Sequence, residues 1–351
     1  MSGASQPVRS AEETETPKFD PLRQGVRLPL EAVFYPLGFA LELATNSPDV
    51  MAAAEENWSG FAPAFEHPPI RLRIAVDEDN PGPCPESLIF RAQRHLLTMI
   101  SDPANFAVCD LAGGFAFCWF TPATARNRAW LRYFYLDVVV YLILWHQRLT
   151  RIHASCVALN GRGLLLCGPS GAGKSCLAYA CARRGWTFVS DEATSLVRGS
   201  PQRIVLGKPR HIHFRETAVE ILPELNGRRT TRNFAGKTTI ELSTAKMPGI
   251  RTAFQCRAAA VVFLAREESG PAYLVPVSKD EGWRRLEQDL PLFDQPVHEE
   301  HKASLRDLLE TGVYELRYSG LDDAVRTLEE LVGVGQAISS ARGARCDTSG
   351  S

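Results

Sequence analysis

The chain has 351 residues, of which 45% are hydrophobic and 23% charged, and its formal net charge is −1. A chain of this length fits two domains of ordinary size, and the composition excludes a disordered or fibrous protein. The near-neutral charge argues against a general nucleic-acid or membrane-surface binder, because both need a sustained positive field. We therefore expect neither nucleic acid nor membrane among its partners.

Several further features of the sequence indicate the cellular compartment of the protein. The nine cysteines are scattered without a Cys-x-x-Cys pair, which suits a reducing compartment and supports neither a disulfide scaffold nor a zinc knuckle. Residues 1–22 are polar and acidic, unlike a signal or transit peptide, and we predict a flexible tail there. The apolar stretch Trp130–Trp145 is interrupted by Arg132 and Asp137, so it is too short to span a bilayer and should form a buried helix. These features predict a cytoplasmic protein.

Residues 23–149 are predicted to form a smaller α+β domain of unknown role. Its patterns predict strands over 31–46 and 69–77, a helix over 85–100, a hairpin over 105–121 and a long helix over 128–149. We place the domain boundary near 148–151.

From Ile152 the pattern changes to strand, glycine-rich turn, helix and strand, which is typical of a parallel α/β unit. We predict strands over 153–159, 163–167, 186–190, 258–265 and 313–318, and helices over 175–184, 279–290 and 321–331. This second domain should span 150–335. The remaining stretch, 336–351, is small and polar, and we expect a second flexible tail.

The residues GPSGAGKS, Gly168–Ser175, fit G-x-x-x-x-G-K-[ST] in full and lie between an apolar strand and a helix. Glycines allow a tight turn that directs N–H groups at phosphate oxygens, and the helix adds its positive end. Lys174 would reach the β- and γ-phosphates and Ser175 would bind Mg²⁺. The alternative is a glycine-rich turn with an exposed lysine. The predicted nucleotide-binding residues are Gly168, Pro169, Ser170, Gly171, Ala172, Gly173, Lys174, Ser175 and Cys176.

Asp191 and Glu192 follow the strand 186–190, at the edge where parallel sheets bind ligands. An acid there can bind Mg²⁺, and a second can accept a proton from an attacking hydroxyl. The alternative is that Asp191 caps a helix over 193–197. His153 opens the preceding strand, where a histidine on its own is more often structural.

The spacing of His153, Gly168, Lys174 and Asp191 resembles the catalytic domain of the HPr kinase/phosphorylase family. That family has a histidine ahead of a G-x-S-G-x-G-K-S loop and an Asp-Asp pair after an R-G-h-x-h-h-x-D-D strand. This chain reads RIHASCVALNGRGLLLCGPSGAGKS and then RRGWTFVSDE, so the resemblance covers 151–194. It implies a phosphate-loop α/β core, also found in phosphoenolpyruvate carboxykinase.

The resemblance also implies roles for individual residues. Lys174 and Ser175 would bind ATP and Mg²⁺, with Glu192 as a second Mg²⁺ ligand. Asp191 would be the base that takes the proton from a seryl hydroxyl, with His153 orienting it or sharing the proton. The implied partner is a protein or peptide acceptor. The chain resembles the HPr-kinase-related group, some of whose members belong to peptide-modification systems, more than it resembles the bacterial regulator of the family.

The chain also departs from the family pattern. Cys176 stands where the family has an acid, Glu192 replaces the second aspartate, and GKPRHIHFRETAVEIL, Gly207–Leu222, stands where the E-h-R-G-h-G signature is expected. The acceptor, the reverse phosphorolysis and the oligomeric state, including a homo-oligomer, therefore stay open.

Two basic clusters follow the core, at 208–215 and 228–237, and one of their residues could stabilise charge on a transferred phosphate. Lys208 and Arg210 are the candidates, against the alternative of a solvated surface. We favour an ATP-dependent kinase acting on a serine of a protein or peptide. A small-molecule hydroxyl kinase on the same core and a non-catalytic ATP-binding regulatory module remain as alternatives.

Overall fold

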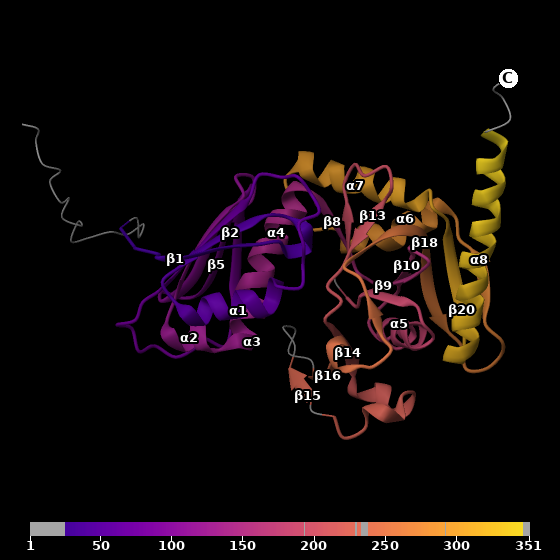
Figure 1. The fold of residues 1–351 in the computed structure, drawn as a ribbon, viewed down its shortest axis with the longest axis horizontal. Coiled ribbons are helices and arrows are strands. Elements are labelled where there is room, and N and C mark those ends of the chain that lie inside the picture. Colours follow the sequence, from indigo (N-terminus) through magenta and orange to yellow (C-terminus); the bar gives the residue numbers. More distant parts are fainter. Residues whose placement is uncertain (1–24, 193, 229, 233–237, 292, 347–351) are drawn as a thin grey trace, which may run out of the picture.

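A computed structural model describes residues 25–346 except 193, 229, 233–237 and 292. The fold is mixed α/β and contains three sheets (Figure 1). The tail expected at 1–22 lies outside the described residues. Residues 30–147 form the N-terminal half of the described chain, and residues 149–346 form the C-terminal half.

The N-terminal half is built on a seven-stranded mixed sheet in the order β1-β2-β3-β7-β6-β5-β4. Its strands are β1 (Leu30–Phe34), β2 (Leu41–Thr45), β3 (Ile70–Val76), β4 (Ile89–Gln93), β5 (Leu96–Asp102), β6 (Asn105–Asp110) and β7 (Phe115–Phe120). The helices are α1 (Pro48–Trp58), α2 (Pro122–Arg126), α3 (Arg128–Trp130) and α4 (Asp137–Gln147), with a π-helical turn η2 (Leu131–Leu136) and a 3-10 turn η1 (Pro36–Gly38).

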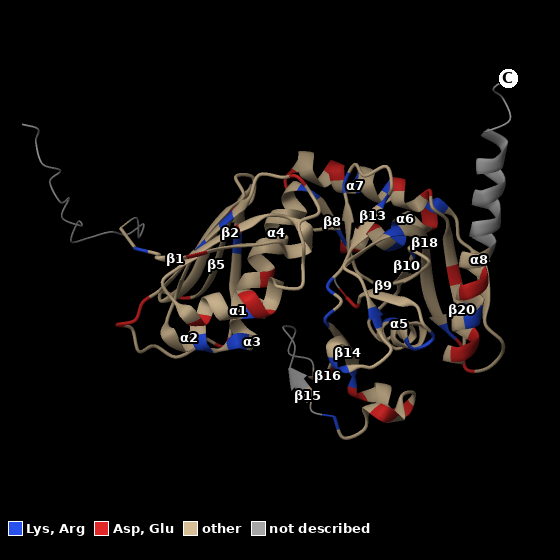
Figure 2. Ribbon diagram, viewed as in Figure 1, with Lys and Arg blue, Asp and Glu red and all other residues tan. Residues whose placement is uncertain are grey.

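Side chains alternate across this sheet, so each row of paired residues faces one side. The row Leu43, Leu72, Ala116, Cys109 and Leu97 is in register across five strands, and all five are buried. Helices α1 and α4 pack on this half of the chain (Figure 1), within one apolar core. Asp137 is the only Asp, Glu, Lys or Arg residue in helix α4, so the helix is almost entirely tan in Figure 2.

Two predicted elements of this half are wrong. The helix expected over 85–100 is the hairpin of β4 and β5, which turns at Arg94 with a φ of 55°. Every residue of the edge strand β4 is exposed, so burial does not impose a period-two pattern on its sequence. The strand expected over 31–46 is two strands, β1 and β2, separated by η1. The hairpin over 105–121 is confirmed as β6–β7. The helix over 128–149 is confirmed for 128–147, as α3, η2 and α4, whereas Leu149 begins β8.

The C-terminal half contains a ten-stranded sheet in the order β17-β11-β9-β10-β18-β13-β12-β8, with β20 beside β18 and β19 beside β20. Its strands are β8 (Leu149–Ile152), β9 (Ala154–Leu159), β10 (Arg162–Cys167), β11 (Thr187–Ser190), β12 (Thr194–Val197), β13 (Ile204–Leu206), β17 (Arg251–Thr252), β18 (Gln255–Arg266), β19 (Tyr273–Pro276) and β20 (Val313–Tyr318). Helices α5 (Lys174–Arg183) and α8 (Leu321–Cys346) share one core, and α6 (Lys279–Leu286) and α7 (Gln295–Leu309) share another.

A third, three-stranded sheet has the order β14-β16-β15 and lies beside α5 (Figure 1). It consists of β14 (His211–Arg215), β15 (Thr230–Arg232) and β16 (Thr238–Ser243). Short 3-10 turns complete the half: η3 (Glu216–Glu220), η4 (Pro223–Leu225), η5 (Thr244–Lys246) and η6 (Glu287–Asp289). Helix α8 runs to Cys346, so it continues into the stretch where we expected a flexible tail.

The parallel unit expected from residue 152 is only partly present. Strand β10 is parallel to β18, and β18 to β20, but β9 lies antiparallel between β10 and β11. Because β9 runs opposite to both neighbours, its first residue lies at the same sheet edge as the last residues of β10 and β11. Ala154 pairs with Cys167, and Cys156 with Ser190. This edge therefore brings together three segments that are distant in sequence.

The two halves share an apolar core. The cluster of the N-terminal half includes Leu149 and Leu206, and Ile204 and Phe254 from the C-terminal half pack against it. Across the described stretches of the chain, no helix is both long and apolar enough to cross a bilayer. The segment Trp130–Trp145 instead is helical and has buried positions throughout its length, as expected.

Candidate functional site

The loop between β10 and α5 has the backbone shape that its glycines allow. Gly171 and Gly173 have φ angles of 98° and 93°, in the left-handed region that favours glycine. A Cβ on Gly173 would collide with the hydroxyl of Tyr318, which itself donates a hydrogen bond to the Ala172 carbonyl at 3.0 Å. Arg215 of β14 donates a hydrogen bond to the Ser170 hydroxyl across the same loop. The loop is thus fixed from two sides at the start of a helix.

Lys174 begins helix α5 and its side chain folds back over the loop. Its ammonium donates to the carbonyls of Gly168 at 2.7 Å and Pro169 at 3.3 Å, and lies 3.2 Å from His153 Nε2. Since the ammonium has only donors, Nε2 of His153 accepts and carries no proton. Burial lowers the pKa of His153, and the charge of Lys174 lowers it further.

Carboxylates affect the pKa of this lysine. Burial lowers the pKa of Lys174, while the charges of Glu192, Asp191 and Asp289 oppose that shift. Glu192 is exposed, whereas Asp191 is only 4% exposed. The site therefore combines a buried cation, Lys174, with two acids, Asp191 and Glu192, that directly follow β11 at this sheet edge.

Asp191 directly follows β11 and is held by hydrogen bonds from two elements. Its Oδ2 accepts from the main-chain N–H of His213 at 2.7 Å. The Ser155 hydroxyl lies 2.5 Å from the Asp191 main-chain oxygen and 3.3 Å from Oδ1. That hydroxyl has one proton and the shorter contact is to the main chain, so Oδ1 is the oxygen left to accept a further proton.

Several predicted site residues have partners that differ from those expected. His153 contacts Lys174, whereas the hydrogen-bond partners of Asp191 are Ser155 and His213. The alternative that Asp191 caps a helix is wrong, because Thr194–Val197 is the strand β12. Cys176 is buried in the first turn of α5, where burial raises the pKa of its thiol to about 11.

Lys208 and Arg210, the expected phosphate contacts, point elsewhere. Lys208 donates to Asn57 and Asp137, and Arg210 donates to Ser59, all in the N-terminal half. In the first basic cluster it is Arg215 that contacts the loop. In the second cluster, Arg229 and Lys237 lie outside the described residues.

Sequence reasoning missed His213, Ser155 and Asp289 as parts of this site. The signal for His213 is the H-x-H pattern His211–His213, which places two titratable rings on one face of β14, while Ile212 and Phe214 on its other face are buried. Ser155 carries no such signal, because a serine in an apolar strand resembles any core hydroxyl.

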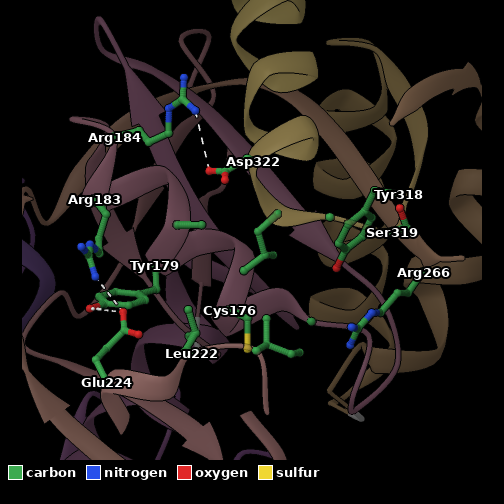
Figure 3. Close-up of a pocket in the computed structure, with 15 residues that line it drawn as sticks. Cys176, Tyr179, Arg183, Arg184, Leu222, Glu224, Arg266, Tyr318, Ser319 and Asp322 are labelled. Atoms are coloured by element: carbon green, nitrogen blue, oxygen red, sulfur yellow. Dashed lines mark hydrogen bonds and ion pairs between the residues drawn. The ribbon is translucent and has the colours of Figure 1, made fainter. Parts of the chain in front are cut away.

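A cavity of about 520 Å³ opens beside the first turns of α5. Figure 3 shows Cys176 at its base, Tyr179, Arg183 and Glu224 on one side, and Arg266, Tyr318 and Ser319 on the other. The ion pairs Arg183–Glu224 and Arg184–Asp322 border it. The cavity also includes Gly173, so it adjoins the end of the loop.

The observed class is a mixed α/β protein in which a glycine-rich loop, a lysine and two acids meet at one sheet edge. No protein-family model matches the sequence, and no curated protein matches it. Among solved structures, the HPr(Ser) kinase/phosphatase from Coxiella burnetii is similar, with a TM-score of 0.30 and 15% sequence identity, over 54% of this chain and 98% of that chain. The similarity is low, and the proposal below is based on the site itself and on the sequence motif.

Within the described residues, no group of three or more His, Cys, Asp or Glu side chains has the arrangement of a metal site. Such a cluster is not required for Mg²⁺ held chiefly by phosphate oxygens, which commonly uses one or two protein ligands.

Proposed function

We propose that this protein is an ATP-dependent kinase that transfers the γ-phosphate to a hydroxyl, most specifically that of a serine in a protein or peptide. The single observation that carries the proposal is the meeting of the Gly168–Ser175 loop with the buried carboxylate of Asp191 at one sheet edge. A protein that only binds nucleotide needs the loop, whereas phosphoryl transfer to a hydroxyl also needs a proton acceptor. The serine acceptor follows from the sequence resemblance over 151–194.

The loop residues fit a triphosphate. The left-handed glycines and the N-terminus of α5 suit the binding of anionic oxygens. The Lys174 ammonium now donates to two loop carbonyls, and phosphate oxygens are stronger acceptors that it can reach by rotating its side chain. Arg215, already in contact with Ser170, is the further cation that we assign to the phosphates in place of Lys208 and Arg210.

Mg·ATP, when bound, supplies the phosphoryl group and a metal ion that neutralises part of its charge. Ser175, next to Lys174 at the start of α5, and the exposed Glu192 are the residues that would hold the metal. Asp191 Oδ1 would accept the proton of the attacking hydroxyl, because its other oxygen is already engaged by a main-chain N–H.

The cavity beside the loop suits the nucleoside part of ATP. It adjoins Gly173 and Cys176, and its rim offers the aromatic face of Tyr179, the Tyr318 hydroxyl and the guanidinium of Arg266. Ligand sites of this kind combine apolar walls with a few polar groups. Its volume of about 520 Å³ lies in the ordinary range for such sites.

The direct test incubates the protein with Mg²⁺, γ-labelled ATP and degenerate peptide libraries that fix serine, threonine or tyrosine at the centre. We expect label on the serine library, and phosphoserine on hydrolysis of the labelled peptide. The matched control is Asp307→Asn, which removes an acid of an exposed ion pair with Arg203 away from the loop. Binding of ATP without transfer to any library or to proteins of the source cell would favour a regulatory ATP-binding module. Absence of ATP binding would exclude both functions.

A further inference from the structure

A continuous series of polar contacts leads from Asp191 through the three-stranded sheet to the N-terminal half. His213 of β14 pairs directly with Glu241 of β16, so the two side chains lie on the same face. The ring Nδ1 of His213 lies 3.6 Å from Asp191 Oδ2, and its Nε2 lies 3.6 Å from Glu241 Oε2. The imidazole thus stands between two carboxylates at ion-pair distance.

The far end of this series belongs to the turn η2. The Tyr133 hydroxyl donates to Glu241 Oε2 at 3.0 Å and lies 3.5 Å from His213 Nε2. Arg132 Nη2 lies 3.7 Å from Glu241 Oε1, and His211 Nε2 lies 3.3 Å from the same oxygen. Glu241 is therefore the point at which the two halves meet on the path to Asp191.

The charges along this path alternate. Burial acts to lower the pKa of His213, but Asp191 and Glu241 on its two sides outweigh burial and raise the pKa to about 9. The contact with His213 lowers the pKa of Glu241 to about 2. His211 is different, since burial lowers its pKa to about 4. At neutral pH the protonated His213 ring therefore lies beside an ionised Glu241.

We propose that His213 and Glu241 are positioning residues for Asp191, and that Tyr133 and Arg132 extend this support into the N-terminal half, so that phosphoryl transfer depends on contacts made by both halves. This inference rests on the proposed function, in which Asp191 accepts the proton. The imidazolium fixes the carboxylate from the side opposite Ser155, and Glu241 fixes the imidazolium. An error of about 1 Å in such a group can lower a rate about a hundredfold.

A purely structural role for these residues makes a different prediction. A network that only joined the sheets would, when weakened, lower stability and nucleotide binding together. A positioning network instead lowers the turnover number and leaves the dissociation constant for ATP unchanged, because the loop is also held by Tyr318 of β20, which lies outside this network. Because these residues contact one another in series, the effects of their substitutions on turnover should also be non-additive.

The test uses the full-length protein with His213→Gln, Glu241→Gln, Tyr133→Phe and the double variant Tyr133→Phe/Glu241→Gln. None of these changes removes the main-chain N–H of residue 213 that donates to Asp191. Turnover is measured as phosphate release from saturating Mg·ATP, with water in place of the acceptor, and as transfer to the serine peptide library. Nucleotide affinity is measured by titration with ATP, and Asp307→Asn is again the control.

We expect turnover at least about tenfold lower in His213→Gln and Glu241→Gln, a smaller loss in Tyr133→Phe, and no further loss in the double variant compared with Glu241→Gln. ATP affinity should stay within about twofold. Unchanged turnover in Glu241→Gln, or a parallel loss of affinity, would overturn the inference.

A second measurement separates this inference from the proposed function. Histidine ring resonances in nuclear magnetic resonance report the charge of His213 without any turnover. We expect a protonated ring at pH 7.5 in the wild type, and a proton lost at lower pH in Glu241→Gln. A neutral His213 in the wild type overturns the inference even if the protein is a kinase. A protonated His213 in a protein that transfers no phosphate overturns the proposed function and, with it, the positioning role.

Discussion

Lys174 makes three close contacts: two with the carbonyls of Gly168 and Pro169 in its own loop, and one with the ring of His153, which lies between β8 and β9. In the proposed site, ATP replaces these contacts with charge-assisted ones to phosphate. Removing one charged hydrogen-bond partner costs about 1.5–3 kcal/mol, so Lys174→Met should weaken ATP binding roughly ten- to a hundredfold. Calorimetric titration with Mg·ATP measures this, and an unchanged affinity would mean that the loop does not bind the nucleotide.

Substitution of Asp191 should lower the rate of phosphoryl transfer and leave ATP binding unchanged. An amide in place of its carboxylate keeps the contact with the His213 N–H but cannot accept a proton. We expect Asp191→Asn to lower transfer at least about a hundredfold, in line with the usual contribution of a general base, with ATP affinity within about twofold. Transfer that persists in this variant would exclude Asp191 as the base.

The pair His213 and Glu241 predicts a dependence of stability on pH. The folded-state pKa of His213 is raised from 6.5 to about 9, so its contribution is fully present below pH 6.5 and is lost as the pH rises through 9. The pKa of Glu241 is lowered from 4.5 to about 2, so its contribution is present above pH 4.5 and lost as the pH falls through 2. The difference in melting temperature between wild type and Glu241→Gln should therefore be largest between pH 4.5 and 6.5. A constant difference from pH 4 to 9 would contradict the pairing.

At the scale of elements, the loop depends on its packing against β20. Gly173→Ala places a methyl group against the Tyr318 hydroxyl and forces alanine into a left-handed conformation. We expect lower ATP affinity and a lower melting temperature. The double variant Gly173→Ala/Tyr318→Phe removes the collision but not the backbone strain, so it should recover part of the affinity. Equal affinity in the single and double variants would exclude the collision as the cause.

The elements that the sequence predicted correctly are those with strong local signals. The loop Gly168–Ser175, the strand before it and the helix after it carry a motif together with an apolar period. The antiparallel β9 was not predictable as such, because Ala154–Leu159 has the same apolar pattern whether its neighbours are parallel or antiparallel. The prediction of a helix where the β4–β5 hairpin lies was wrong because an exposed edge strand has no burial pattern to identify it.

The residues of the candidate site that were identified from the sequence are likewise those with a local signal. His153, Lys174 and Asp191 were identified from spacing, and the structure brings His153 to Lys174. His213 and Glu241 join the path only through the pairing of β14 with β16 and its contact with η2. Pairing between segments distant in the chain leaves little trace in a single sequence, so the contacts of His213 with Asp191 and Glu241 could not be predicted, although the H-x-H pattern marks His213 itself.

At the scale of the whole molecule, the halves are joined by a mostly buried ion pair. Lys208 donates to Asp137 at 2.6 Å and to Asn57 at 2.7 Å. Lys208→Met leaves Asp137 without its cation, and breaking a buried pair from one side costs about 3–5 kcal/mol. We expect a clear fall in melting temperature by calorimetry, which Lys208→Met/Asp137→Leu should largely restore. Equal stability of the wild type and the single variant would show that the pair contributes nothing.

The core that crosses between the halves has a consequence for the solubility of fragments. A fragment that begins at residue 150 would expose Leu206, which is fully buried, and the apolar side chains of Ile204 and Phe254 that pack beside it. Contiguous apolar patches of this kind promote association. We expect such a fragment to aggregate in light-scattering measurements while the full chain stays monodisperse, and a monodisperse fragment would contradict this. The N-terminal half therefore covers an apolar surface of the half that carries the loop and keeps that surface from self-association.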